Sequence, residues 1–174
     1  MDIQQKENPK VRLVFNNIQV VYYEDRYASE FRRLNYEWLE GFGLLEPADM
    51  NYLDAPRQTI IEKGGQIFFA IEDEWVIGTC AVLSSSPTVV ELAKLAVTAA
   101  AQGRGIGRLL TEVAIDYAQE IGMEKIILVS NSRLVKALRL YESMGFRHTP
   151  PPLDPVYASA DVYMELIFIP KPGD

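Results

Sequence analysis

The stretch over residues 92–117, LAKLAVTAAAQGRGIGRLLTEVAIDY, constrains the fold more than any other part of the chain. Residues 92–97 are short and apolar and predict a buried strand, in which the ammonium of Lys94 must find water or a partner. Farther on, apolar residues recur at steps of three and four positions, which predicts an amphipathic helix. These residues are Ile106, Leu109, Leu110, Val113, Ala114 and Tyr117. A strand, a glycine-rich turn and a helix therefore follow one another directly.

The turn between this strand and this helix is QGRGIG, residues 102–107. Its three glycines remove Cβ atoms where the helix begins, so a ligand can approach the backbone closely. The N–H groups of the first helical turn have no partners within the helix, and they lie at the positive end of its dipole. This combination predicts an anion site, and a phosphate is the usual anion at such a turn.

Two common phosphate motifs are excluded by the residues around the turn. A Walker loop ends in Gly-Lys-Ser/Thr, but Gly107 is followed by Arg108 and a leucine. A dinucleotide fingerprint needs G-x-G-x-x-G, and frames that begin at Gly103 or Gly105 place Arg108 or Leu110 at the third glycine position. The turn therefore does not predict binding of a nucleoside triphosphate or of a nicotinamide dinucleotide.

The rest of the chain predicts an α/β domain on a mixed sheet, with a crossover through the long helix. Strand-like runs occupy residues 11–23, with a turn at Asn16-Asn17 if they form a hairpin, and residues 66–72, 75–83, 125–129 and 162–169, the last stopped by Pro170. Helical spacing occupies residues 27–39, 57–63 and 134–144, the last with Asn131 or Ser132 as its N-cap. Residues 46–49 predict a short turn, and residues 149–152 an irregular segment.

Length and charge limit the classes of function. With 174 residues, 48% of them hydrophobic, the chain suits one compact domain, which we expect over residues 11–174 after a flexible segment at residues 1–10. Seventeen basic and 24 acidic residues give a formal charge of −7, which disfavours nucleic-acid binding. No signal-peptide core and no apolar run of about 18 residues occur, so we expect a cytoplasmic protein without membrane insertion.

Cys80 is the only cysteine and His148 the only histidine. One cysteine cannot form an intramolecular disulfide, and one cysteine with one histidine cannot form a zinc-finger type of site. No metal is expected. Cys80 lies in a strand-like run and is expected in the core, whereas His148 is expected in a loop.

The turn matches the pattern Gln/Arg-x-x-Gly-x-Gly/Ala through Gln102, Gly105 and Gly107. It thereby resembles the acetyl-coenzyme A motif of the GNAT superfamily of N-acetyltransferases. The resemblance implies that the backbone of the preceding strand pairs with the pantetheine arm and that the amides of the turn hold the pyrophosphate. The cofactor-binding residues that it implies are Leu95, Ala96, Val97, Gln102, Gly103, Arg104, Gly105, Ile106, Gly107, Arg108, Asn131 and Tyr141.

A second segment, NSRLVKALRLYESMGF at residues 131–146, also resembles this family, through an Asn after the fifth strand and the pattern Ala-x-x-x-Tyr-x-x-x-Gly-Phe. The resemblance implies that Tyr141 lies beside the sulfur of the thioester, although the residue alone would suit ordinary core packing. It also implies a single GNAT-like domain, with a mixed sheet of about six to seven strands flanked by helices. The sheet is expected to splay between its fourth and fifth strands.

A narrower group within the family is similar over residues 91–97, ELAKLAV, and residues 64–70, GGQIFFA. This similarity supports cofactor binding rather than any one acceptor. Histone-type members carry a glutamate base at the position of Glu91. The residue alone is equally compatible with an ordinary carboxylate at the end of a strand. Asp161 and Glu46 are the alternative bases.

The chemistry needs a base for the acceptor amine and an acid for the departing thiolate. Tyr141 is the candidate acid, and strand N–H groups near Leu95 or Val97 would stabilise the oxyanion. The resemblance implies acetyl transfer from acetyl-CoA to a primary amine of a small molecule or peptide; the alternative is a non-catalytic acyl-CoA sensor. A homodimer is left open. The acceptor is not specified, although acidic residues over residues 24–63 would suit a cationic amine.

Overall fold

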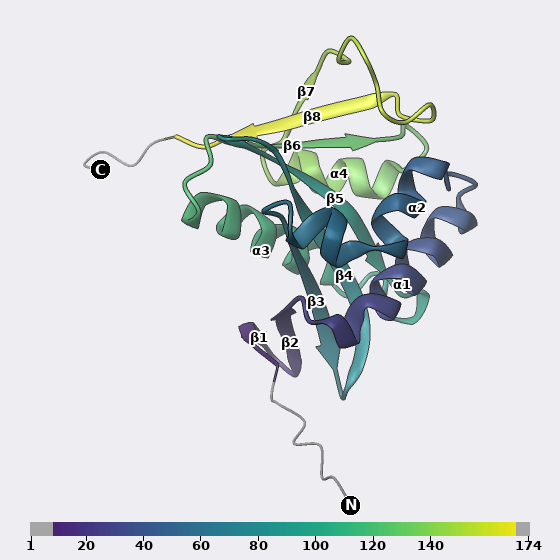
Figure 1. Cartoon of the computed structure of the whole chain (residues 1–174), viewed down its shortest axis with the longest axis vertical. Coiled ribbons are helices and arrows are strands. Elements are labelled where there is room, and N and C mark those ends of the chain that lie inside the picture. The colour runs from purple at the N-terminus through teal and green to yellow at the C-terminus, as the bar shows by residue number, and fades with distance from the viewer. Residues whose placement is uncertain (1–8, 170–174) are drawn as a thin grey trace, which may run out of the picture.

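A computed structural model describes residues 9–169 of the protein, which form a single-domain α/β fold around one mixed sheet (Figure 1). The sheet has eight strands in the order β1-β2-β3-β4-β5-β6-β8-β7. They are β1 (Val11–Phe15), β2 (Ile18–Tyr22), β3 (Gln66–Glu72), β4 (Trp75–Ser86), β5 (Val89–Val97), β6 (Lys125–Ser130), β7 (Arg147–Thr149) and β8 (Val162–Ile167). Residues 1–8 and Pro170, which the sequence analysis assigned to a flexible segment and a strand stop, lie outside the described residues.

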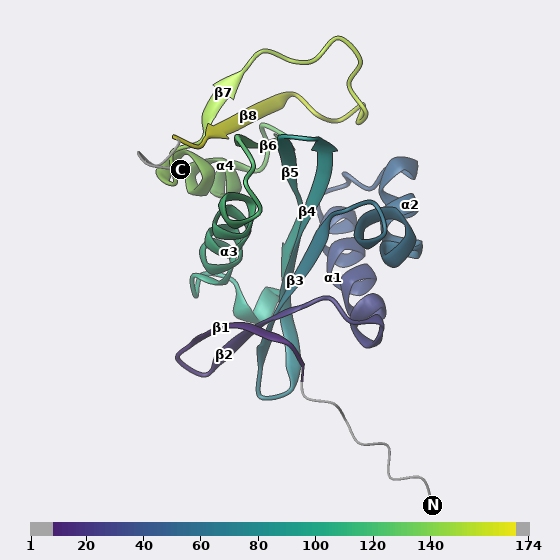
Figure 2. The same ribbon diagram turned by 60° about the vertical axis from the view of Figure 1, so that its left-hand side comes forward.

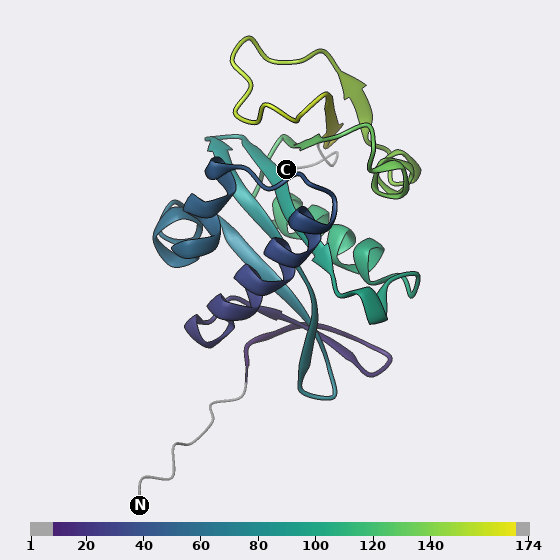
Figure 3. The same cartoon turned by 90° about the vertical axis from the view of Figure 1, so that its right-hand side faces the viewer.

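The helices fill the connections between these strands. They are the α-helices α1 (Ala28–Gly41), α2 (Pro47–Asp54), α3 (Ile106–Glu120) and α4 (Val135–Ser143), the 3-10 turns η1 (Asp25–Tyr27) and η3 (Ala99–Ala101), and the π-helical turn η2 (Arg57–Ile61). Helices α3 and α4 cover one face of the sheet, and α1, α2 and η2 cover the other (Figures 2 and 3). None of the helices within residues 9–169 is long and apolar enough to span a bilayer.

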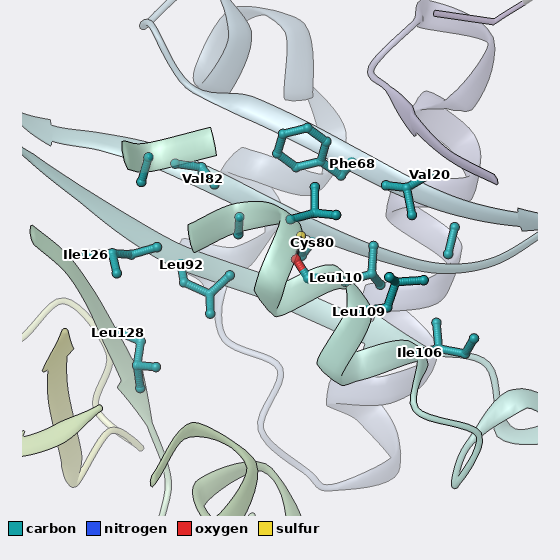
Figure 4. Packing of buried hydrophobic residues seen from close by; sticks show 14 of the residues in the cluster. Val20, Phe68, Cys80, Val82, Leu92, Ile106, Leu109, Leu110, Ile126 and Leu128 are labelled. Atoms are coloured by element: carbon teal, nitrogen blue, oxygen red, sulfur yellow. Dashed lines mark hydrogen bonds between the residues drawn. The ribbon is translucent and has the colours of Figure 1, made fainter. Parts of the chain in front are cut away.

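Each face of the sheet has its own hydrophobic core, because alternate residues of a strand point to opposite faces. Phe68 packs in the core beneath α3, together with Cys80, Leu92 and Leu110 (Figure 4). Its neighbour Phe69 packs in the core beneath α1. The central strands are therefore buried on both sides, which explains their nearly continuous apolar sequence.

The neighbouring strands are antiparallel except β5 and β6, which are parallel and joined by the crossover through α3. Residues Val89 to Leu92 of β5 pair with Lys125 to Leu128 of β6, and the pairing ends there. Strand β6 continues along β8 as far as Ser130, whereas β5 continues along β4 as far as Val97. From the sequence, a splay is expected between the fourth and fifth strands. Because residues 11–23 form two strands, the strands before and after α3 are β5 and β6, and the splay lies between them.

Two predictions of local structure were wrong, the first at a local capping signal and the second at a short strand that only its distant partner reveals. The expected turn at residues 46–49 is the start of α2, where Glu46 and Asp49 form a reciprocal capping box behind Pro47. His148 lies in strand β7, opposite Met164, rather than in a loop, and the sheet has one strand more than the highest expected count. The segment expected to be irregular, residues 149–152, is irregular from Pro150 onward, and only Thr149 belongs to β7. A three-residue strand carries too little pattern to be seen without its partner.

The start of α4 also differs from the prediction. Its N-cap is Leu134 rather than Asn131 or Ser132. The Asn131 side-chain oxygen accepts a hydrogen bond from the backbone N–H of Arg133 at 2.9 Å, which closes a turn before the helix begins. The side-chain N–H of Asn131 donates to the carbonyl oxygen of Ser159 at 2.5 Å. Asn131 therefore joins the end of β6 to the loop before β8.

Gly65 provides a direct test of this packing. A Cβ placed there would lie 2.6 Å from the carbonyl oxygen of Val82 and 3.0 Å from that of Ile60, whereas a Cβ at Gly41 meets nothing within 4 Å. We expect Gly65→Ala to lower the free energy of unfolding by about 1–3 kcal/mol through overpacking. Gly41→Ala is the matched control and should be neutral or slightly stabilising. Equal denaturation midpoints for the two variants would contradict the tight contact.

Candidate active site

The glycine turn before α3 has the geometry of an anion site. Gly103 and Gly105 have left-handed φ values of 76° and 82°, and Gly105 is the N-cap of α3. Within residues 9–169, the backbone N–H groups of residues 103–108 donate no hydrogen bond to a backbone or side-chain oxygen. A Cβ at either glycine would meet nothing within 4 Å. The turn therefore presents a row of unpaired amides at the positive end of a helix.

The arginines of the turn are already engaged by other side chains. The guanidinium of Arg104 donates to both carboxylate oxygens of Glu72, at 2.9 and 2.7 Å. This hydrogen-bonded pair holds the pKa of Glu72 below its ordinary value. Arg108 donates to Ser143 Oγ at 2.6 Å and so ties the start of α3 to α4. The backbone amides, rather than these side chains, are the groups left for a ligand.

Helix α4 lies next to the glycine turn and carries Tyr141. A Cβ at Gly107 would lie 3.7 Å from Cδ2 of Leu140, the residue before Tyr141. The Tyr141 side chain is buried, and its ring centroid lies 5.8 Å from that of Phe146. Burial, with a smaller contribution from Cys80, raises the pKa of the Tyr141 phenol above its ordinary value. The phenol therefore stays protonated at neutral pH and is able to donate a proton.

Strand β5 bulges at Lys94, just past the last pair with β6. The register with β4 shifts between Thr79 and Ala81, so β5 carries one extra residue there, and Lys94 has a left-handed φ of 54°. Beyond Lys94, residues Ala96 and Val97 pair with β4, Leu95 lies within the bulge, and none of the three pairs with β6. Their other edge, toward β6, lies beside the splay. The structure thus brings this segment, the glycine turn and Tyr141 to one end of the sheet.

Glu91 lies on the other face of β5. Its neighbours Val90 and Leu92 pack beneath α3, and Glu91 pairs in register with Leu83, which packs in the core under α1. Glu91 lines a cavity of about 470 Å³. Burial raises the pKa of its carboxyl group, opposed in part by the nearby charge of Lys94. Within residues 9–169, no side chain forms a hydrogen bond with this carboxylate.

The two alternative carboxylates have other partners. Asp161 is exposed and accepts hydrogen bonds from the N–H and Oγ of Ser132, at 2.7 and 2.6 Å. Glu46 accepts one from Ser159 Oγ at 2.6 Å and one from the N–H of Ala158 at 2.9 Å. These hydrogen bonds hold the pKa of both carboxyl groups below the ordinary value. Both are weaker bases than Glu91, and both serve to hold loops in place.

A buried ion pair that the sequence analysis missed lies beside Glu91. The Lys94 ammonium contacts the Asp49 carboxylate of α2, and the two side chains are only 6% and 3% exposed. The same ammonium donates to the Tyr157 hydroxyl at 3.1 Å and lies over the rings of Tyr52 and Tyr157. A lysine in an apolar strand signals a buried acid, but the sequence does not show which acid.

The remaining candidates have structural positions. Cys80 is fully buried, its thiol donates to the Leu110 carbonyl oxygen at 3.5 Å, and burial raises its pKa, so its assignment to the core is confirmed. His148 is exposed, with Nε2 2.8 Å from a carboxylate oxygen of Glu142. Within residues 9–169, no group of three or more His, Cys, Asp or Glu side chains is placed to hold a metal ion.

A turn of unpaired amides before α3, a splayed pair of parallel strands and a buried tyrosine on α4 are the features that the resemblance to the acetyltransferases implies. The profile of the Acetyltransferase (GNAT) family matches residues 17–146. The chain belongs to this family.

Two curated relatives support the assignment. An uncharacterised N-acetyltransferase of Schizosaccharomyces pombe is 28% identical over 127 residues, which cover 71% of this chain and 78% of the relative. An uncharacterised N-acetyltransferase of Escherichia coli, YjgM, is 27% identical over 93 residues, covering 51% of this chain and 56% of the relative. The chain therefore spans little more than half the length of some of the curated relatives that it matches.

Solved structures show the same fold. A GNAT-family acetyltransferase of Staphylococcus aureus superposes with a TM-score of 0.77 at 19% identity, over 85% of this chain and 97% of that protein. The Salmonella typhimurium protein yncA, determined with its cofactor acetyl-CoA, superposes with a TM-score of 0.70 at 21% identity, over 87% of this chain and 94% of that protein.

Proposed function

We propose that this protein transfers the acetyl group of acetyl-CoA to a primary amine of a small molecule or peptide, by direct attack within a ternary complex. The observation that carries the proposal is the row of unpaired amides at residues 103–108, next to the open segment of β5. Membership of the GNAT family and the acetyl-CoA bound in yncA support the choice of donor. The pyrophosphate would lie on the amides, and the pantetheine arm along Leu95 to Val97.

Two proton transfers are needed, and Glu91 and Tyr141, on opposite faces of the sheet, would each carry out one of them. An ammonium acceptor must first lose a proton, because an alkyl amine with a pKa of about 10.4 is almost wholly protonated at neutral pH. Glu91, directly or through a water, would take that proton. Attack by the neutral amine forms the C–N bond and leaves one proton too many on its nitrogen. As the C–S bond breaks, Tyr141 would give its proton to the thiolate of coenzyme A, and the proton released from the nitrogen would restore the phenol through solvent. The raised pKa of Glu91 makes its carboxylate a stronger base, and the Tyr141 phenol keeps its proton at neutral pH until the thiolate departs.

Acetyl-CoA binding is tested at Gly107, where a side chain would obstruct the amides without straining the backbone. Gly107 lacks the left-handed φ of Gly105, and its nearest contact is 3.7 Å away. We expect Gly107→Val to abolish binding measured by calorimetry while circular dichroism remains unchanged. Arg104→Ala should weaken binding less, because Arg104 is 44% exposed and adds only a screened charge. Unchanged affinity in folded Gly107→Val would refute the assigned position of the pyrophosphate.

Turnover is tested at Tyr141. Tyr141→Phe keeps the ring and removes the hydroxyl, so we expect kcat to fall by roughly 10²-fold or more with little change in acetyl-CoA affinity. Tyr117→Phe is the control, since Tyr117 is a half-buried core tyrosine whose ring packs on Phe68. Thiol release against a panel of amines gives the rates. Near-normal turnover in Tyr141→Phe would leave Tyr141 with a packing role. If the unaltered protein binds acetyl-CoA but turns over with none of the amines, the alternative of an acyl-CoA sensor is favoured.

The base is tested by the pH dependence of Glu91→Gln. At high pH a larger fraction of the acceptor amine is already unprotonated, so less depends on an enzymic base. We therefore expect the loss in kcat/KM to be largest near neutral pH and to shrink as the pH rises. Asp161→Asn should show no such trend. A loss that is the same at every pH would mean that Glu91 holds the acceptor or the strand instead.

A further inference from the structure

The cavity beside Glu91 carries an excess of negative charge. Three carboxylates line it, from Glu91, Asp154 and Glu165. The only basic side chain in its lining within residues 9–169 is Lys125, whose Nζ donates to Glu165 at 2.8 Å. That pair is neutral, which leaves Glu91 and Asp154 without a counter-charge in the cavity wall. A partly enclosed, negatively charged cavity attracts cations and disfavours anions.

Two other basic residues lie close to the cavity and do not change this balance. Lys94 is held by Asp49 and by the Tyr157 hydroxyl, so its ammonium is already paired. Arg147 is opposite Glu165 in the β7–β8 ladder, but it is exposed and does not line the cavity. Neither Lys94 nor Arg147 therefore gives the cavity a positive charge that could bind a carboxylate of the acceptor.

Aromatic and apolar side chains form the rest of the wall. Tyr52 and Tyr157 line the cavity, and their ring centroids lie 5.5 and 5.0 Å from the Lys94 ammonium. The same two rings thus already contact an ammonium group of the chain itself, which is the cation–π arrangement that an amine would use. Ile127, Val129 and Pro150 add an apolar surface suited to the body of a ligand.

We propose that this cavity takes the acceptor and that the acceptor is a cationic amine with an apolar body and no carboxylate beside the amine. This inference rests on the proposed acetyl transfer and narrows its substrate class. The acidic residues to which the sequence analysis pointed do not form the site. Asp25 is paired with Arg57, and Asp54 with Arg32, on the surface. The carboxylates that face the cavity come instead from β5, from β8 and from the loop that carries Asp154.

Matched pairs of amines test the proposal. Cadaverine and lysine, and likewise tyramine and tyrosine, differ by one carboxylate beside an amine. With saturating acetyl-CoA we expect kcat/KM from thiol release to be at least about tenfold higher for the amine without the carboxylate in each pair. Equal or better use of lysine and tyrosine overturns this inference while acetyl transfer stands. No release with any of the four also overturns it, and peptide amines then test the proposed function separately.

Charge reversal at Asp154 tests the electrostatic cause. Asp154 is exposed, so Asp154→Lys should fold normally. We expect the cadaverine-to-lysine ratio of kcat/KM to fall by roughly fivefold or more, because the new charge repels the dication and attracts the carboxylate. Asp116→Lys makes the same change on the exposed side of α3 and should leave the ratio unaltered. A merely structural defect would lower both rates together, and an unchanged ratio in folded Asp154→Lys overturns the assigned role of the charge.

Discussion

The early end of the pairing between β5 and β6 is the constraint on which the candidate site depends. These parallel strands share only the pairs from Val89 and Lys125 to Leu92 and Leu128. Beyond them each strand follows a different antiparallel partner, β4 for one and β8 for the other. The backbone at the carboxyl end of β5 is therefore not consumed by its parallel neighbour. Ligands of open α/β sheets bind at such carboxyl ends, where the N-terminus of the following helix also lies.

The bulge at Lys94 couples this open segment to the loops on the other face. The extra residue directs the Lys94 side chain to Asp49 of α2, next to the capping box that Asp49 forms with Glu46. Glu46 in turn holds the N–H of Ala158 in the loop that covers the cavity. A buried ion pair contributes little net stability, since desolvation offsets the attraction. Its consequence here is geometric, because Lys94 fixes both helix α2 and the loop at Tyr157 relative to the strand.

The elements that the sequence predicted best are those with a strong local period. The strand, glycine turn and helix around Gly105 were correctly predicted because apolar spacing and a glycine N-cap are properties of neighbouring residues. The partners of Lys94 were not predicted, because Asp49 and Tyr157 are far from it in sequence and close only in the fold. The strand around His148 was missed for the same reason. Of the candidate bases, only the folded chain separates Glu91 from Glu46, since both are plain glutamates in sequence and differ in the donors around them.

An acidic chain that binds an anionic donor presents an electrostatic difficulty, which the arrangement of the proposed site removes. With a formal charge of −7, the protein gains little from long-range attraction of phosphates. The arginines of the turn do not compensate, because Arg104 is paired with Glu72 and Arg108 contacts Ser143. Backbone amides at a helix N-terminus carry partial positive charge without a formal charge, and they act only at short range. The donor side thus attracts an anion locally, while Glu91 and Asp154 give the cavity an excess of negative charge that would attract a cationic amine. The amides of the glycine turn and the carboxylate of Glu91 belong to opposite faces of the sheet, and the splay between β5 and β6 is the point at which a thioester and an amine would meet.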